Sequence, residues 1–268
     1  MGRVVSLHIY PMKSAAAVDL TVAELTPRGF AGDRRWMLID ETGEMLSSRR
    51  SPTLLRVTAK LQEDGLLLNA PDREPLNVEV PNTEPTRAEI WGQWTTGRDA
   101  GDAAAEWFSS YLGRPCRLLY QSDADIRPVK PRPNTVESDH VSFADGYPVL
   151  LIGTASLAEL NRWIGRTPPI LMDRFRPNIV VETSRPFEED DWQSFRLGDA
   201  AFVNAKPCPR CVLTTFDPQS AQRDPDGEPL KALAKRRRDP NGDVVWFGTN
   251  VMPRSAGPIR VGDEFSTS

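Results

Sequence analysis

The chain has 268 residues, enough for one large domain or two smaller ones with a sizeable core. Its net charge of -4 argues against a dedicated nucleic-acid binder, and no apolar run approaches the ~20 residues that a membrane span needs. Three cysteines in a chain of this length do not make a disulfide framework. We therefore expect a reducing, cytoplasmic protein with no membrane partner and no nucleic-acid polymer as partner.

Short β-branched and apolar stretches separated by turn residues predict a β-rich first half. The Glu63-Asp64-Gly65 sequence is a tight-turn signal between two of these strands. Apolar residues at helical spacing predict a helix between Asp102 and Gly113. The strands are expected at residues 3–10, 18–22, 37–39, 45–47, 54–61, 66–68, 87–91 and 117–120.

A polar, proline-rich stretch at residues 121–139 predicts a long loop, and we place a domain boundary near its start, between residues 122 and 123. Two further helices are expected, one before Gly165 and one beginning at Pro229. Strands are expected at residues 147–152, 179–182, 194–198, 201–204, 212–215, 244–247 and 259–265. Many short strands and three helices indicate a β-rich α+β protein.

Cys208 and Cys211 lie three residues apart on a proline-flanked corner, Cys208-Pro-Arg-Cys211. A zinc site would need further ligands, but Cys116, His8 and His140 are scattered and form no second pair. A thioredoxin-like pair would precede a helix, whereas a strand-like sequence follows here. Two structural thiols remain possible, and so does a single thiolate that binds a metal held mainly by a cofactor.

Three basic segments each stand where a predicted strand meets a turn, at residues 13–14, 33–35 and 174–178. Lysine, serine and arginine at such corners suit an anionic or phosphorylated ligand, because arginine binds oxyanions in bidentate fashion. Surface charge, or pairing of the arginines with Asp33 and Asp173, would give the same pattern. No Gly-x-Gly-x-x-Gly, Walker or Gly-x-Ser-x-Gly motif supports nucleotide binding or serine hydrolysis.

A set of motifs runs through nearly the whole chain in a fixed order. In chain order they are Ile9-Tyr-Pro-Met-Lys13-Ser14, Gly32-Asp-Arg34-Arg-Trp-Met-Leu, Ala155-Ser-Leu-Ala-Glu-Leu-Asn, Phe175-Arg176-Pro-Asn178-Ile-Val, Glu189-Asp-Asp-Trp192, Cys208-Pro-Arg-Cys211-Val-Leu-Thr-Thr, Gly227-Glu-Pro-Leu230-Lys, Phe247-Gly and Gly257-Pro-Ile-Arg-Val-Gly-Asp263. This set resembles the MOSC-domain molybdenum proteins of the mitochondrial amidoxime-reducing component type and their bacterial relatives. The resemblance implies a β-rich MOSC N-terminal domain at residues 1–122, packed on a MOSC β-barrel domain at residues 123–268.

The resemblance also implies a cofactor, a mononuclear molybdenum bound by the dithiolene of molybdopterin and by one protein thiolate. That thiolate would be Cys211, as metal ligand and catalytic residue, and Cys208 would be a packing residue. Asp145 would be a second catalytic residue, in a proton relay. The other implied cofactor-binding residues are Lys13, Ser14, Arg34, Gly146, Tyr147, Arg176, Asn178, Pro209, Arg210 and Asn250.

The implied activity is that of an oxidoreductase with a role in detoxification, which reduces N-hydroxylated compounds such as hydroxylamines, amidoximes or N-hydroxylated bases. Because the chain shows no four-cysteine ferredoxin-like domain, its electrons would come from a separate ferredoxin-, flavoprotein- or cytochrome-type protein. An alternative is a sulfur-carrier module that holds a persulfide on Cys211. A third possibility is a β-barrel binding module with structural cysteines.

Overall fold

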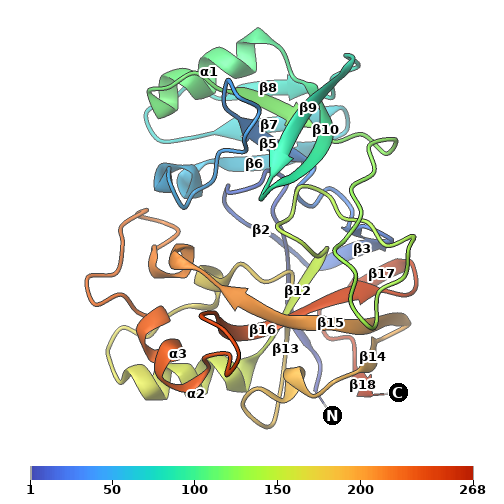
Figure 1. Ribbon diagram of the computed structural model, residues 1–268, viewed down its shortest axis with the longest axis vertical. Coiled ribbons are helices and arrows are strands. Elements are labelled where there is room, and N and C mark those ends of the chain that lie inside the picture. The colour runs from blue at the N-terminus through green and yellow to red at the C-terminus, as the bar shows by residue number, and fades with distance from the viewer. Residues whose placement is uncertain (1, 268) are drawn as a thin grey trace.

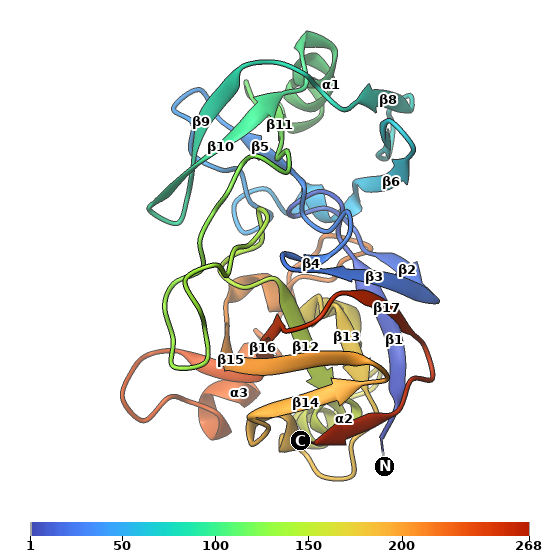
Figure 2. The same cartoon turned by 90° about the vertical axis from the view of Figure 1, so that its right-hand side faces the viewer.

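The computed structural model describes residues 2–267 and shows an upper and a lower body stacked along the long axis (Figure 1). Strands outnumber helices in the described chain, which has three α-helices, and this confirms the β-rich α+β class. No helix within these residues is long and apolar enough to cross a membrane. Both marked ends of the chain lie at the bottom of the lower body (Figure 2).

The lower body is built on an eight-stranded sheet in the order β18-β14-β15-β16-β12-β13-β1-β2. A second sheet, β17-β3-β4, packs against it, and side chains such as Leu25 and Ile259 share a core with Leu7 and Val149. The strands are β1 (Val4–Ile9), β2 (Val18–Leu20), β3 (Val22–Thr26), β4 (Gly29–Phe30), β12 (Val149–Gly153), β13 (Ile179–Val181), β14 (Ser194–Leu197), β15 (Ala200–Arg210), β16 (Val245–Pro253), β17 (Gly257–Arg260) and β18 (Phe265–Thr267).

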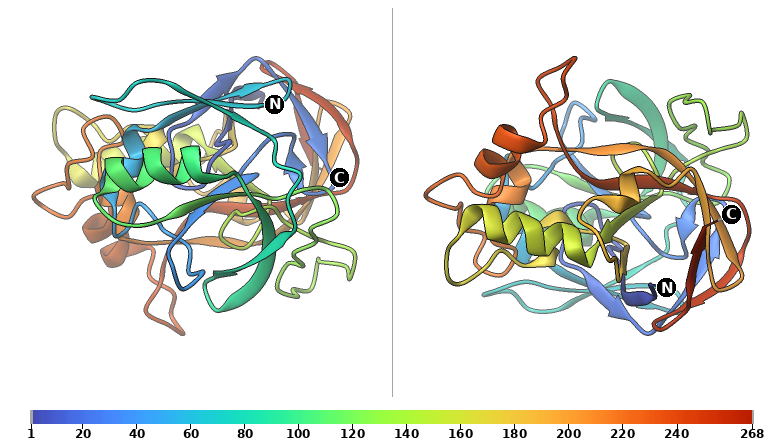
Figure 3. Two further views of the ribbon diagram at one scale, coloured as in Figure 1. Left: turned by 90° about the horizontal axis from the view of Figure 1, so that it is seen from above. Right: turned by 90° about the horizontal axis from the view of Figure 1, so that it is seen from below.

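Two helices, α2 (Thr154–Ile164) and α3 (Leu230–Arg236), cover one face of this sheet (Figure 3). Their apolar faces bury Leu160 and Leu233 against Phe247 of β16. Three short 3-10 helices complete the lower body: η2 (Met172–Phe175), η3 (Glu188–Asp190) and η4 (Val212–Thr215).

The upper body contains two sheets, β5-β11-β10-β9 and β6-β7-β8, with helix α1 packed against them. Its helix ends at Gly113, whose left-handed backbone (φ 66°) suits glycine. The elements are β5 (Trp36–Ile39), η1 (Pro52–Arg56), β6 (Thr58–Gln62), β7 (Gly65–Asn69), β8 (Leu76–Glu79), β9 (Pro85–Ile90), β10 (Gln93–Asp99), α1 (Asp102–Leu112) and β11 (Arg117–Tyr120).

The lower body draws on both ends of the chain. β1 pairs with β13, and β3 pairs with β17, although β1 and β3 precede the boundary predicted between residues 122 and 123. Strands from the two sides of that boundary therefore pair with each other. The boundary itself stays a prediction. The chain passes from the lower to the upper body between β4 and β5 and returns through the long loop between β11 and β12.

Several predicted strands differ from the structure. The strand expected at 54–61 begins in the 3-10 helix η1, the one expected at 259–265 is divided between β17 and β18, and the one expected at 45–47 is reduced to an isolated bridge at Met45.

The largest difference follows the cysteine corner. Residues 212–215 form the 3-10 helix η4 instead of a strand. The backbone carbonyl of Cys211 accepts hydrogen bonds from the amide (3.1 Å) and the hydroxyl (3.0 Å) of Thr214, and the Thr215 hydroxyl donates to the Val212 carbonyl (2.7 Å). Threonine side chains that bond back to the main chain offer the backbone this alternative to a strand.

Candidate functional site

A cleft between the two bodies brings together every residue that the sequence analysis named as a site residue. It encloses about 870 Å³, counting the part open to solvent. The predicted residues that line it are Lys13, Ser14, Arg34, Asp145, Gly146, Tyr147, Arg176, Asn178, Pro209, Arg210, Cys211 and Asn250. They come from both bodies, and their individual roles stay predictions.

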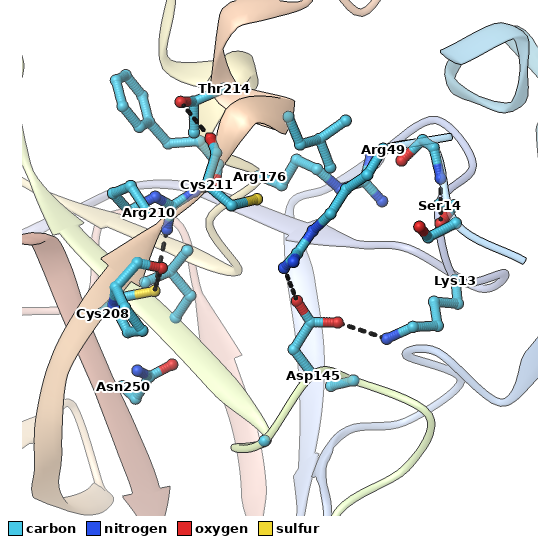
Figure 4. A pocket seen from close by; sticks show the side chains of 18 of the residues that line it. Lys13, Ser14, Arg49, Asp145, Arg176, Cys208, Arg210, Cys211, Thr214 and Asn250 are labelled. Atoms are coloured by element: carbon cyan, nitrogen blue, oxygen red, sulfur yellow. Dashed lines mark hydrogen bonds and ion pairs between the residues drawn. The ribbon is translucent and has the colours of Figure 1, made fainter. Parts of the chain in front are cut away.

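The two cysteines of the corner are not equivalent. All three cysteines of the chain are free thiols, so Cys208 and Cys211 form no disulfide. The Cys208 sulfur accepts a hydrogen bond from Arg210 Nη1 at 3.0 Å, and Arg210 Nη2 donates to the Phe175 carbonyl at 2.7 Å. Cys211 stands at the beginning of η4, and its sulfur points into the cleft without a hydrogen-bond partner among residues 2–267 (Figure 4).

The structure does not support a metal site made of protein side chains alone. Within residues 2–267, no group of three or more histidine, cysteine, aspartate or glutamate side chains is placed to hold a metal ion. The four-ligand zinc site considered for Cys208 and Cys211 therefore does not form in the described part of the chain. A metal bound by Cys211 would need most of its ligands from a cofactor.

Arg34 is fixed in the cleft by a buried ion pair. Its Nη1 donates to Asp33 Oδ2 at 2.6 Å and to Asn178 Oδ1 at 2.9 Å, while Asp33 Oδ1 accepts the Tyr10 amide at 2.8 Å. Burial raises the pKa of Asp33, and the charge of Arg34 opposes that shift. The pair and its hydrogen bonds hold one cation at a defined place in the wall of the cleft.

A second arginine stands beside the first. The guanidinium carbons of Arg34 and Arg176 lie 4.3 Å and 4.1 Å from the centroid of the Tyr10 ring. Burial lowers the pKa of Arg176 to about 10, so its side chain remains cationic at neutral pH. Arg34, Arg176 and Ser14 all have left-handed backbones, with φ of 47°, 56° and 73°. Such strained residues cluster at functional sites, where the surrounding structure holds them in place.

Asp145 joins two cations across the cleft (Figure 4). Lys13 Nζ donates to Asp145 Oδ1 at 2.6 Å and to the Phe143 carbonyl at 2.7 Å, and Arg49 Nη2 donates to Asp145 Oδ2 at 3.3 Å. Enclosure in the cleft raises the pKa of Asp145, but Lys13 and Arg49 outweigh this and hold that pKa well below its usual range. Asp145 is therefore ionised at neutral pH. Buried Arg127 fixes this segment by donating to the Ala144 carbonyl at 2.9 Å.

Lys13 is expected to titrate near neutral pH. Burial lowers its pKa to about 8 from the ordinary 10.5, while Asp145 opposes the shift. Between these values the unfolded chain binds the proton and the folded chain does not, so the free energy of unfolding should rise as the pH rises from about 8 to 10.5. The ¹³Cε resonance of Lys13 should titrate near pH 8, and Asp145→Asn should lower that midpoint. A midpoint near 10.5 would contradict the burial of this ammonium group.

The cleft is strongly cationic in a protein whose net charge is -4. Among residues 2–267, one carboxylate, Asp145, lines it. Six cationic side chains line it as well: Lys13, Arg34, Arg49, Arg174, Arg176 and Arg210. A concave site lined by charges of one sign concentrates the field, so the cleft suits an anionic ligand.

Some lining residues were not predicted. Arg49 follows Ser47 and Ser48, and the Ser48 amide donates to Ser14 Oγ at 3.1 Å. This Ser-Ser-Arg-Arg sequence follows the apolar pair Met45-Leu46 and is a basic corner similar to the three that were recognised. Trp91 also lines the cleft, but it stands at the end of a predicted strand and carries no sequence signal for a site.

The sequence matches two protein families in succession. Residues 1–115 match the MOSC N-terminal beta barrel domain, and residues 138–266 match the MOSC domain. The mitochondrial amidoxime reducing component 2 of Rattus norvegicus is 35% identical over 281 residues, covering 98% of this chain and 82% of the relative. The mitochondrial amidoxime-reducing component 1 of Homo sapiens is 32% identical, and the alignment again covers 98% of this chain and 82% of the relative.

Among solved structures, the YUAD protein from Bacillus subtilis aligns over 99% of this chain and 94% of its own, with 10% identity and a TM-score of 0.44. The family assignment rests on the sequence matches, which run through both bodies and include the cysteine corner. The resemblance inferred from the ordered motifs is thereby confirmed. This chain belongs to the MOSC-domain family that includes the mitochondrial amidoxime-reducing components.

Proposed function

We propose that this chain is a molybdenum cofactor-dependent reductase of N-hydroxylated compounds. The observation that carries the proposal is the free thiol of Cys211 in a cleft lined by six cationic side chains. The names of the relatives, which are amidoxime-reducing components, support the same activity.

The residues of the cleft fit such a cofactor. A thiolate is a soft ligand suited to a transition metal, and Cys211 has no hydrogen-bond partner among residues 2–267 that would compete with a metal. Cationic side chains suit the phosphate and the dithiolene of molybdopterin, which are anionic. Besides Cys211, the residues that would hold the cofactor are Lys13, Ser14, Arg34, Gly146, Tyr147, Arg176, Asn178, Pro209, Arg210 and Asn250.

Reduction of a hydroxylamine to an amine and water consumes two electrons and two protons. The bound cofactor would supply the two electrons that break the N–O bond. Asp145, held ionised by Lys13 and Arg49, would position the Lys13 ammonium group, and its lowered pKa makes it a weak proton acceptor. Lys13 carries the exchangeable proton of this pair, because burial brings its pKa to about 8. In the relay proposed at Asp145, Lys13 Nζ would therefore be the proton donor.

The electron donor would be a separate protein of the ferredoxin, flavoprotein or cytochrome type. The three cysteines of the chain are too few and too dispersed for an iron–sulfur cluster held by four thiolates. The relatives carry a mitochondrial name, whereas the cysteine usage of this chain suggested the cytoplasm, so its compartment stays a prediction.

The proposal is tested by elemental analysis and pterin fluorescence of the chain purified from a host that makes and inserts the cofactor. We expect molybdenum and pterin in stoichiometric amounts, and reduction of hydroxylamine and of an amidoxime with a chemical electron donor. A chain from such a host that contains neither molybdenum nor pterin, and reduces neither substrate, would refute the proposal.

A second candidate, a sulfur carrier, is favoured by the same asymmetry between the cysteines. The free sulfur of Cys211 faces the cleft, while Arg210 binds that of Cys208, so one thiol is available to hold a persulfide. Mass spectrometry separates the two functions. A stable gain of about 32 Da, one sulfur atom, on Cys211 without pterin would identify the carrier.

A further inference from the structure

A tryptophan occupies a turn position that asparagine, aspartate or glycine usually fills. Ile90 of β9 pairs with Gln93 of β10, so Trp91 and Gly92 form the two-residue loop of this hairpin. Their φ angles are 51° and 76°, and positive φ at both central residues is the requirement of a type I′ turn. A bulky side chain pays a steric cost for this backbone. Such a cost persists at sites where the side chain itself is needed.

The Trp91 side chain is used in the cleft. It lines the cleft with 41% of the residue exposed, and the guanidinium carbon of Arg49 lies 4.0 Å from its ring centroid. Arg49 in turn binds Asp145 at 3.3 Å, which holds the guanidinium in place (Figure 4). An exposed aromatic ring, with an arginine fixed against it by a carboxylate, forms a rigid flat surface at the mouth of the cleft.

The cleft divides by depth into a floor and a rim. Lys13 and Arg34 are only 6% and 12% exposed, so the deepest positive charges belong to the floor, where the anionic cofactor would be held. Arg49 is 31% exposed and Trp91 is more exposed still, so this pair belongs to the rim. A small molecule that enters from solvent meets the rim first.

We propose that Trp91 and Arg49 form a binding platform for the planar, conjugated part of an N-hydroxylated substrate. Amidoximes and N-hydroxylated bases are planar around the reacting nitrogen, so they can stack on the ring or on the guanidinium, whereas hydroxylamine itself offers no flat surface. The platform gives the chain a preference for planar substrates. This inference rests on the proposed function and adds a determinant of specificity to it.

The test compares Trp91→Asn with a matched change on the same hairpin, Trp94→Asn. Trp94 is 49% exposed and has the Arg87 guanidinium 3.7 Å from its ring centroid, but it does not line the cleft. The measured quantity is the kcat/KM for benzamidoxime divided by the kcat/KM for hydroxylamine. We expect Trp91→Asn to lower this ratio by about five- to tenfold. Trp94→Asn should leave it unchanged, and Trp91→Phe, which keeps an aromatic face, should retain most of it.

Two further readouts separate a platform from a structural role. Asn-Gly is a preferred sequence for a type I′ turn, so the Tm of Trp91→Asn should hold or rise while selectivity falls. Molybdenum and pterin content should match that of the unchanged chain. An unaltered substrate ratio would overturn the proposal. So would a loss of pterin in Trp91→Asn, because Trp91 would then be a contact of the cofactor.

Binding without turnover distinguishes failure of the platform from failure of the proposed function. The proton resonances of benzamidoxime should broaden when the unchanged chain is added. The broadening should be smaller with Trp91→Asn and should equal that of the unchanged chain with Trp94→Asn. Broadening that depends on Trp91 in a chain that reduces nothing would leave the platform standing and refute the reductase. If Trp91→Asn reduced the substrates as well as the unchanged chain did, and no broadening depended on Trp91, the reductase would stand and the platform would be refuted.

Discussion

Replacing Cys211 by alanine is expected to abolish both molybdenum binding and the reduction of N-hydroxylated substrates. The side chain would be the protein ligand of the metal, and within residues 2–267 no group of three or more metal-binding side chains is assembled to replace it. Loss of a group that merely supports a metal ligand typically costs 10–100-fold, so loss of the ligand itself should leave less than about 1% of the activity. Metal analysis and steady-state kinetics on the same preparation measure both effects.

Cys208→Ala is the matched control, three residues away on the same corner. It removes a sulfur that accepts a hydrogen bond from Arg210, so we expect a loss of about 1 kcal/mol in the free energy of unfolding and retention of the metal. Equal loss of molybdenum in the two variants would show that the corner acts as a unit and that the sulfur of Cys211 has no special role. Full metal content in Cys211→Ala would refute the ligand assignment.

The basic corners could be found from sequence because turn chemistry is local. Lys13, Arg34 and Arg176 each follow or precede a strand whose apolar pattern is plain, and each stands at a turn. The order of strands in the large sheet brings the corners of Lys13 and Arg176 together, because β1 lies next to β13. Arg34 precedes β5 of another sheet and joins them through its hydrogen bond to Asn178. No local pattern contains that order. The ordered motifs of the family implied the shared site instead, as a resemblance between whole chains.

The rest of the cleft depends on contacts between distant segments. The charge state of Asp145 is set by Lys13, 132 residues earlier in the chain, and no spacing rule connects them. Strand β10 was missed because Gly97 interrupts its pattern, yet a Cβ atom there would lie 3.0 Å from Leu119 and from Phe143. Tertiary packing thus selects glycine where local propensity disfavours it. Trp91 enters the cleft because this hairpin folds over the lower body, a placement that its own sequence does not express.

Replacing Asp33 by alanine is expected to cause a large loss of stability. Asp33 is 2% exposed, and it neutralises Arg34 and accepts the Tyr10 amide. Removal of one partner leaves an uncompensated buried charge, which typically costs 3–5 kcal/mol, so we expect a decrease of about that size in the free energy of unfolding. Urea denaturation followed by circular dichroism measures it, and the cofactor content should fall as well because Arg34 loses its fixed position.

Asp123→Ala tests whether burial of the ion pair causes the loss of stability expected for Asp33→Ala. Asp123 pairs with the neighbouring Arg35 at 2.9 Å, but its side chain is 90% exposed. An exposed pair contributes little, so this variant should lose less than about 1 kcal/mol. The double variant Asp33→Ala/Arg34→Leu should recover part of the stability lost in Asp33→Ala, because it also removes the unpaired charge. If Asp33→Ala and Asp123→Ala lowered the free energy of unfolding by the same amount, the 2% exposure of Asp33 would not explain its effect. A buried ion pair would then not be what fixes Arg34 in the cleft.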